Sequence, residues 1–299
     1  RSTLMRSSAA SDVYKRQDGY TPEKAGRVKF ARFSTFGTKE GLPFEVQYLT
    51  AADELVFFSN TNWTTFDLST GEYITKLGQL RRLTISGYGL VDLDPDFKNL
   101  KNLESLDISV NNFEKIPEVL TKENFPKLHA LYLNTCQRGV IYDLSNTTTT
   151  HFGGLFEETD QTREFPRRLL EWDNLDTLTL SVNYLQGRIP DMKDYAQKYT
   201  QADISAADSL PQALVGTPKV LPNIKRFSIN LNRLTGELPE WLLHHPALDW
   251  MDPFTLVFTQ EGKDQDGKLA GFTNEPVNLD EYYRFYEGKK YLDPNKKEE

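Results

Sequence analysis

A spaced string of apolar residues recurs along this chain and constrains its fold more than any other feature. The string is L-x-x-L-x-L-x-x-N/C-x-L, in which isoleucine, phenylalanine or another residue can replace a leucine. Most copies start 23–28 residues after the previous one, but the steps from Leu128 to Leu175 and from Leu175 to Ile224 are 47 and 49 residues. The copies begin at Val28, Ala52, Leu80, Leu103, Leu128, Leu175, Ile224 and Leu248, and those at Leu103, Leu175 and Ile224 are complete.

Each copy predicts one short strand, because successive side chains of a strand point to opposite faces. The L-x-L leucines would face a core, and the residues between them would face away from it. One copy is too small to bury its own apolar side, so neighbouring copies must stack and pair in parallel. The asparagines Asn60, Asn111, Asn183 and Asn232 would bond to the backbone of the adjacent turn as a ladder, and Cys136 occupies the same position.

Several copies continue into G-x-I/L-P, at Gly187–Pro190 and Gly236–Pro239, and Ile116-Pro117 keeps part of this motif. The set resembles the plant-type subclass of leucine-rich repeats, and it is similar to surface leucine-rich-repeat lipoproteins of gut bacteria over roughly residues 26–290. The resemblance implies a right-handed α/β solenoid with a parallel β-sheet on its concave face. It also implies export, a lipid or surface attachment upstream, and a host or neighbour-cell ligand. It brings no catalytic residues.

The spacing predicts a division of the chain into three parts. Residues 1–17 are expected to be a disordered or non-native tail, which places the native N-terminus, with any signal peptide or lipid-anchor cysteine, outside this sequence. Residues 18–252 are expected to form a solenoid of about eight units. The two long steps hold either degenerate repeats or insertions, and we favour insertions near 143–164 and 193–220. Residues 253–299 are expected to cap the last core and to end in a tail.

Composition excludes several classes of partner. The formal net charge is −8, and binding to nucleic acid or to an anionic membrane requires a basic footprint. No run of about 18 apolar residues is present, so no transmembrane segment is predicted. The single cysteine allows no disulfide within the chain. Extracellular leucine-rich-repeat proteins of vertebrates and plants usually cap their ends with cysteine pairs, so the resemblance implies a bacterial or an intracellular protein.

Three short motifs invite chemical roles, and each has a simpler structural interpretation. Cys136 would need exposure and a basic partner to act as a nucleophile, whereas cysteine is common in the ladder position. His244-His245 lack further ligands at metal spacing and are expected in a turn. The segment Asp264–Gly267 lacks the preceding ligand of a calcium loop and is predicted to be a hairpin turn. We therefore predict neither metal, cofactor nor catalytic site.

The remaining candidate surface is formed by the residues that alternate with the core leucines. Its middle is rich in hydroxyl side chains, and its ends carry aromatic residues and arginines, which are typical of binding hot spots. The alternative is that small polar residues merely keep an exposed sheet face soluble. The candidate ligand-binding residues are Phe30, Arg32, Phe58, Arg82, Thr84, Asp107, Tyr132, Asn134, Thr179, Arg226, Asn230 and Trp250.

The sequence thus favours a non-enzymatic module of an exported bacterial protein at the cell surface. It would bind a protein or a glycan through the concave face and the insertions. Two alternatives remain open: a spacer or adhesin stalk that displays another domain, and a targeting domain of a larger enzyme or effector.

Overall fold

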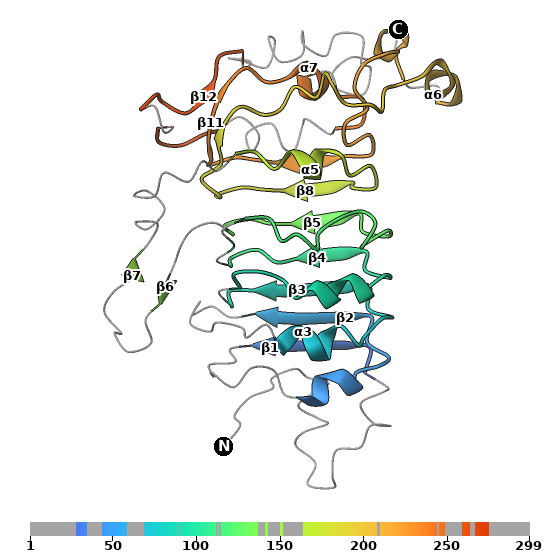
Figure 1. The fold of residues 1–299 in the computed structure, drawn as a ribbon, viewed down its shortest axis with the longest axis vertical. Coiled ribbons are helices and arrows are strands. Elements are labelled where there is room, and N and C mark those ends of the chain that lie inside the picture. The colour runs from blue at the N-terminus through green and yellow to red at the C-terminus, as the bar shows by residue number, and fades with distance from the viewer. Residues whose placement is uncertain are drawn as a thin grey trace, which may run out of the picture. The chain divides into compact units, whose positions relative to one another are not determined.

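The computed structural model divides the chain into two compact units, residues 1–161 and residues 162–299 (Figure 1). Residues 1–17, most of 143–164, Trp250 and much of 253–299 lie outside the residues that the structure describes, so the predictions made for them stay predictions. The described residues are 28–34, 44–58, 69–88, 90–111, 113, 115–136, 141–142, 150–151, 164–207, 210–243, 245–248, 259–263 and 267–274.

The first unit is built on a parallel sheet of five strands that lie side by side in chain order (Figure 1). Its strands are β1 (Phe30–Ser34), β2 (Glu54–Phe58), β3 (Arg82–Ser86), β4 (Ser105–Asp107) and β5 (Ala130–Tyr132). Each strand contains the first core residue of the L-x-L segment of one predicted copy. The register pairs this residue with the corresponding residue of the next strand. Those residues are Ala31, Leu55, Leu83, Leu106 and Leu131, and all are buried.

Short helical turns return the chain from one strand to the next. They are η1 (Phe44–Tyr48), α3 (Ser69–Ile74) and η2 (Pro95–Asn99). In η2 the Asp94 side chain accepts a hydrogen bond from the Asp96 amide at 2.7 Å, and Phe97 is buried beneath the turn. The last hydrogen bond of a turn comes from the first leucine of the next copy. For example, the Leu103 amide donates to the Leu100 carbonyl at 3.1 Å. Farther along, β6 (Ile141–Tyr142) and β7 (Thr150–His151) pair antiparallel.

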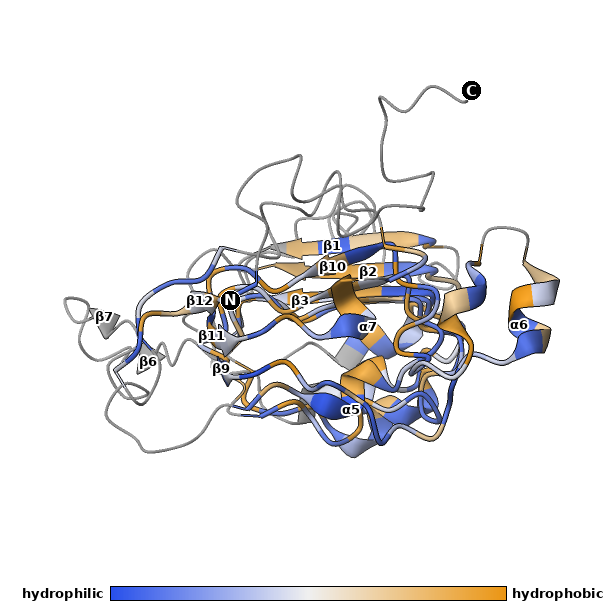
Figure 2. Cartoon of the chain, turned by 90° about the horizontal axis from the view of Figure 1, so that it is seen from above, coloured by the Kyte–Doolittle hydropathy of each residue, from blue (hydrophilic) through white to orange (hydrophobic). Residues whose placement is uncertain are grey.

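The second unit repeats this plan with β8 (Thr177–Thr179) and β10 (Arg226–Ser228) as parallel neighbours. A second parallel sheet joins β9 (Gln186–Gly187), β11 (Arg233–Gly236) and β12 (Gly271–Phe272). Apolar residues of α5 (Arg167–Leu170) and α7 (Glu240–Leu243), orange in Figure 2, are buried. The α/β leucine-rich-repeat fold predicted from the spacing is thereby confirmed.

The segment between β9 and β10 contains α6 (Gln201–Ala206) and η3 (Gln212–Leu214). A capping box joins Thr200 and Asp203 at the start of α6, and Lys219 donates to Asp203 at 2.6 Å. Because β8 pairs directly with β10, this segment adds no strand between them. The assignment of 193–220 as an insertion, and the count of eight units, remain predictions.

Two of the predicted ladder asparagines, Asn111 and Asn232, bond to the backbone as the sequence predicts, whereas Asn60 lies outside the described residues. In the first unit Asn111 Oδ1 accepts from the amides of Tyr88 and Leu90, each at 3.2 Å. Its Nδ2 donates to the carbonyls of Ile85 and Ile108 at 2.8 and 2.7 Å. Asn232 makes the equivalent four bonds in the second unit, to Asn183, Leu185, Leu180 and Ile229.

Among the described repeats, the residue before each ladder position has a left-handed backbone conformation. Glycine occupies this place before Tyr88, the residue at the ladder position of the third copy, with φ 77° at Gly87, and in the other described repeats the conformation falls on residues with a side chain. Such residues pay about 1–2 kcal/mol to adopt it. The corresponding values are 61° at Val110, 59° at Thr135, 60° at Val182 and 55° at Leu231. The repeat therefore imposes a backbone geometry that its local sequence does not favour.

Candidate functional site

The outward face of the first unit is formed by the strand residues that alternate with the core. The register sets these residues in three rows across the strands. One row contains Arg32, Thr84, Asp107 and Tyr132, as the sequence predicted. Phe30 and Arg82 lie in the row on one side of it, and Phe58 and Asn134 follow on the other side. Eight of the twelve candidate residues are therefore on one face of this unit.

Two aromatic side chains and an arginine lie on the outward face where β1 and β2 pair. Phe30 is 42% exposed and Phe58 is 38% exposed, although both are large and apolar. The Arg32 guanidinium lies over the Phe58 ring, with 5.5 Å between Cζ and the ring centroid. Behind them, on the core side, Phe33 and Phe57 stack with their centroids 4.8 Å apart, so the strands that carry the exposed rings are held in a fixed register.

Arg82 on β3 is engaged within the unit. Its Nε and Nη2 bond to Glu54 Oε2 at 2.9 and 2.8 Å. Glu54 is absent from the set of candidates drawn from the sequence, yet it neutralises Arg82 on this part of the face. Its opposition to Arg82 across one strand pair was available in the spacing, because both residues precede an apolar core position by one residue.

The middle of the outward face is polar and internally bonded. Asp107 Oδ1 accepts from the Ser109 amide at 2.9 Å, and Ser109 Oγ accepts from the Asn134 amide at 3.2 Å. Thr84, Asp107, Tyr132 and Asn134 are all half-buried. These contacts stiffen β4 and β5, so this part of the face offers a preformed polar surface.

The second unit carries three more candidates, and one of them is buried. Thr179 is only 6% exposed, so little of its short side chain is available to a ligand, and its role in binding stays a prediction. Burial follows from its position inside a paired strand, where a three-atom side chain is screened by its neighbours. Arg226 is exposed and Asn230 is half-buried. Asn230 Oδ1 accepts from the hydroxyls of Ser181 and Ser228.

The environment of Cys136 favours the structural interpretation over the nucleophilic one. Cys136 is buried, and its thiol donates to the Ile108 carbonyl at 3.2 Å. Burial raises the pKa of this thiol far above its ordinary value of 9.0, which disfavours the nucleophilic thiolate. Among the described residues no group of three or more His, Cys, Asp or Glu could hold a metal ion. No helix in the same part of the chain is long and apolar enough to cross a membrane.

His245 closes a turn with both ring nitrogens. Nε2 lies 3.1 and 3.0 Å from the carbonyls of Val220 and Leu221, and Nδ1 accepts from the amides of Ala247 and Leu248 at 3.2 Å. This pattern requires the neutral tautomer with the proton on Nε2. The turn predicted for His244-His245 is thus present at His245, whereas His244 lies outside the described residues. Of the Asp264–Gly267 segment only Gly267 is described, and Lys263 and Leu269 on either side of it form an antiparallel bridge.

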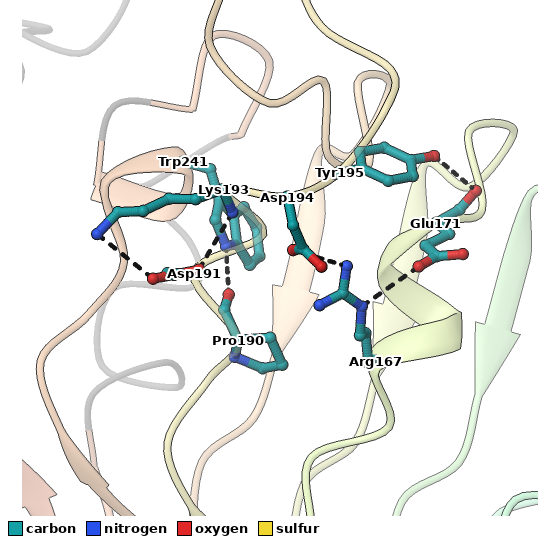
Figure 3. Close-up of polar contacts among 8 residues, drawn as sticks. All are labelled: Arg167, Glu171, Pro190, Asp191, Lys193, Asp194, Tyr195 and Trp241. Atoms are coloured by element: carbon teal, nitrogen blue, oxygen red, sulfur yellow. Dashed lines mark hydrogen bonds and ion pairs between the residues drawn. The ribbon is translucent and has the colours of Figure 1, made fainter.

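A polar cluster on the second unit was not found from the sequence (Figure 3). Arg167 on α5 bonds to Asp194 at 3.0 Å and to Glu171 at 3.4 Å. Nearby, the Tyr195 hydroxyl reaches the Glu171 carbonyl at 3.5 Å, and Trp241 Nε1 donates to the Pro190 carbonyl at 2.8 Å. These contacts attach the segment after β9 to α5 and α7. Arg167 and Asp194 are 27 positions apart and outside the repeated L-x-L positions, so the repeat pattern assigns no contact between them.

Comparison with known proteins agrees with the repeat assignment. Residues 102–122 match the family model of the leucine-rich repeat. No curated protein matches the chain.

Several solved structures are similar to this chain at low identity. The Arabidopsis receptor kinase HAESA, solved with the peptide hormone IDA and the co-receptor SERK1, is 18% identical, with 86% of this chain and 39% of that chain covered and a TM-score of 0.45. A leucine-rich-repeat protein of Leptospira interrogans is 14% identical, with 76% and 51% covered and a TM-score of 0.42. An internalin of Listeria monocytogenes is 15% identical, with 86% and 74% covered and a TM-score of 0.38.

The chain spans 31% of the TDR receptor and 28% of the HAESA ectodomain. No function is carried over from proteins at these similarities.

Proposed function

We propose that this chain is a non-enzymatic protein-binding module whose contact surface is the outward face of the first unit. The observation that carries the proposal is the exposure of Phe30 and Phe58 on neighbouring strands of one sheet face. A polar surface that served only solubility would not need two exposed aromatic rings there. Exposed aromatic side chains beside arginine are typical of the residues that dominate binding energy.

The rigidity of the face supports the same proposal. Its strands are held by parallel pairing, by the Asn111 ladder and by the Phe33–Phe57 stack. A preformed surface loses little conformational entropy when a partner binds, so more of the contact energy appears as affinity. Export from a bacterial cell, attachment at its surface and a glycan as the ligand remain proposals that rest on the sequence resemblance alone.

Selection of short random displayed peptides against the full chain tests this proposal. Peptides that bind should protect the amides of residues 28–34, 54–58 and 82–86 from hydrogen exchange. They should bind the triple variant F30A/F58A/Y132A at least tenfold more weakly, since truncation of one anchor costs more than about 1 kcal/mol. Unchanged affinity for that variant would show that the outward face is not the binding surface. Failure to select any binder would favour the spacer alternative.

A further inference from the structure

Four residues at the β1–β2 end of the outward face form an apolar patch around one cation. We call Phe30, Arg32, Val56 and Phe58 the β1–β2 patch. The register sets Arg32 directly opposite Val56, and Phe58 follows two residues later on the same side. Among the residues that the structure describes, five large hydrophobic side chains are exposed, and the two aromatic ones are both here.

The charge of the patch is set by Arg32. Its guanidinium lies over the Phe58 ring, and no ion pair joins it to an acid among the described residues. Arg82, also on this face, differs because Glu54 already neutralises it with contacts of 2.8 and 2.9 Å. Arg32 is therefore the cation of this part of the face that can still take a carboxylate. Guanidinium is weakly hydrated and presents paired N–H groups that match a carboxylate in shape.

We propose that the β1–β2 patch binds an extended protein segment in which an acidic residue is flanked by apolar side chains. The carboxylate pairs with Arg32, and the apolar side chains cover Phe30 and Phe58. This inference rests on the proposed function and adds the chemistry of the partner.

Charge complementarity favours an acidic segment over a basic segment, a nucleic acid or an anionic membrane as the partner of the β1–β2 patch. A basic segment would meet Arg32 with like charge, while the nearby Glu54 is occupied by Arg82. One arginine with no ion pair to a described acid, in a chain of net charge −8, is no footprint for nucleic acid or for an anionic membrane. A segment with one acid between apolar residues satisfies both the cation and the rings.

The test uses displayed random peptides selected on the full chain, followed by affinity measurements with the synthetic peptides at two salt concentrations. We expect selected sequences to be enriched in Asp or Glu beside an apolar residue. Arg32→Gln should weaken binding about tenfold, which corresponds to loss of one charge-assisted hydrogen bond, and should reduce the dependence on salt.

Glu54→Gln should strengthen binding of the same peptides, because it frees Arg82 to attract the acid. This opposite sign would not arise from general damage to the fold. The matched control is the double variant Y73A/K76Q, which removes a second cation–π pair of the first unit, where Lys76 Nζ lies 5.7 Å from the Tyr73 ring centroid. It should bind the peptides as the wild type does.

The outcomes distinguish the two proposals. If F30A/F58A abolishes binding but Arg32→Gln has no effect and the peptides show no acidic preference, the partner chemistry is wrong and the proposed function stands. If neither variant changes binding, the face itself is wrong. If sedimentation of the chain alone shows a dimer that F58A dissociates, the patch is covered by a second copy, and the acidic-segment proposal is overturned.

Discussion

Replacement of Asn111 by alanine removes a side chain that bonds to five backbone groups at once, and the longest of these bonds is to the Ser109 carbonyl at 3.3 Å. The amides of Tyr88 and Leu90 lose their acceptor at 3.2 Å, and the carbonyls of Ile85 and Ile108 lose a donor at 2.8 and 2.7 Å. Asn111 is 2% exposed, so water cannot replace these bonds without opening the stack. The Ile108 carbonyl keeps the Cys136 thiol as a donor at 3.2 Å. At about 1 kcal/mol for each of the two amides and for the Ile85 carbonyl, we expect a loss of about 3 kcal/mol.

Denaturant unfolding followed by far-UV circular dichroism measures this loss, and hydrogen exchange locates it. The matched control is Asn102→Ala in the same unit, because Asn102 Nδ2 makes one backbone bond, to the Gly78 carbonyl at 2.8 Å. It should cost about 1 kcal/mol. In Asn111→Ala the amides of Tyr88 and Leu90 should also lose protection from exchange. A loss of stability no larger than that of the control would refute the reasoning that the ladder side chain holds adjacent repeats together.

Three further outcomes follow from individual residues. Val110 is half-buried and has a φ of 61°. The substitution Val110→Asn should raise the free energy of unfolding by about 1 kcal/mol, because asparagine tolerates the left-handed region. An unchanged unfolding midpoint would count against backbone strain at this residue. The bonds from Lys219 and Thr200 lower the pKa of Asp203 to about 2 from its ordinary 3.8, so their stabilisation is present above about pH 4 and is lost as pH falls toward 2. Thermal unfolding should therefore separate wild type from Asp203→Asn near neutral pH and bring them together near pH 2, whereas a constant difference would contradict the linkage. Because burial raises the pKa of Cys136, a thiol reagent should label the native chain far more slowly than the unfolded chain, and equal rates would show that the residue is accessible.

The periodic part of the fold could be read from the sequence because each repeat obeys local rules. The alternation of side chains in a strand places Leu83 inward and Thr84 outward whatever the neighbouring repeat contains. Asparagine at the ladder position bonds to the turn beside it, so Asn111 and Asn232 were assigned correctly from spacing alone. The left-handed conformation before that position was not foreseen, because valine at 110 and 182 gives no local signal for it.

The sequence predicted the positions of the candidate site residues but not their exposure. The sequence placed the outward residues in the right rows, since the register follows from the same spacing. Exposure along those rows depends on which side chains stand next to each other on adjacent strands. Thr179 is buried and Phe58 is exposed, although both were expected to face a ligand.

The sequence by itself determined the strands, their inward residues and the ladder, because these depend on intervals within one repeat. Only the tertiary structure decided that Glu54 neutralises Arg82, that Arg32 lies over Phe58, and that Arg167 reaches Asp194. The partners in these three contacts are 26–28 residues apart, which is about one repeat. The distances between their side chains depend on the side-chain conformations that form after the repeats have stacked. Electrostatic and aromatic contacts vary steeply with such distances, so the binding character of the face emerges only after the stack has formed.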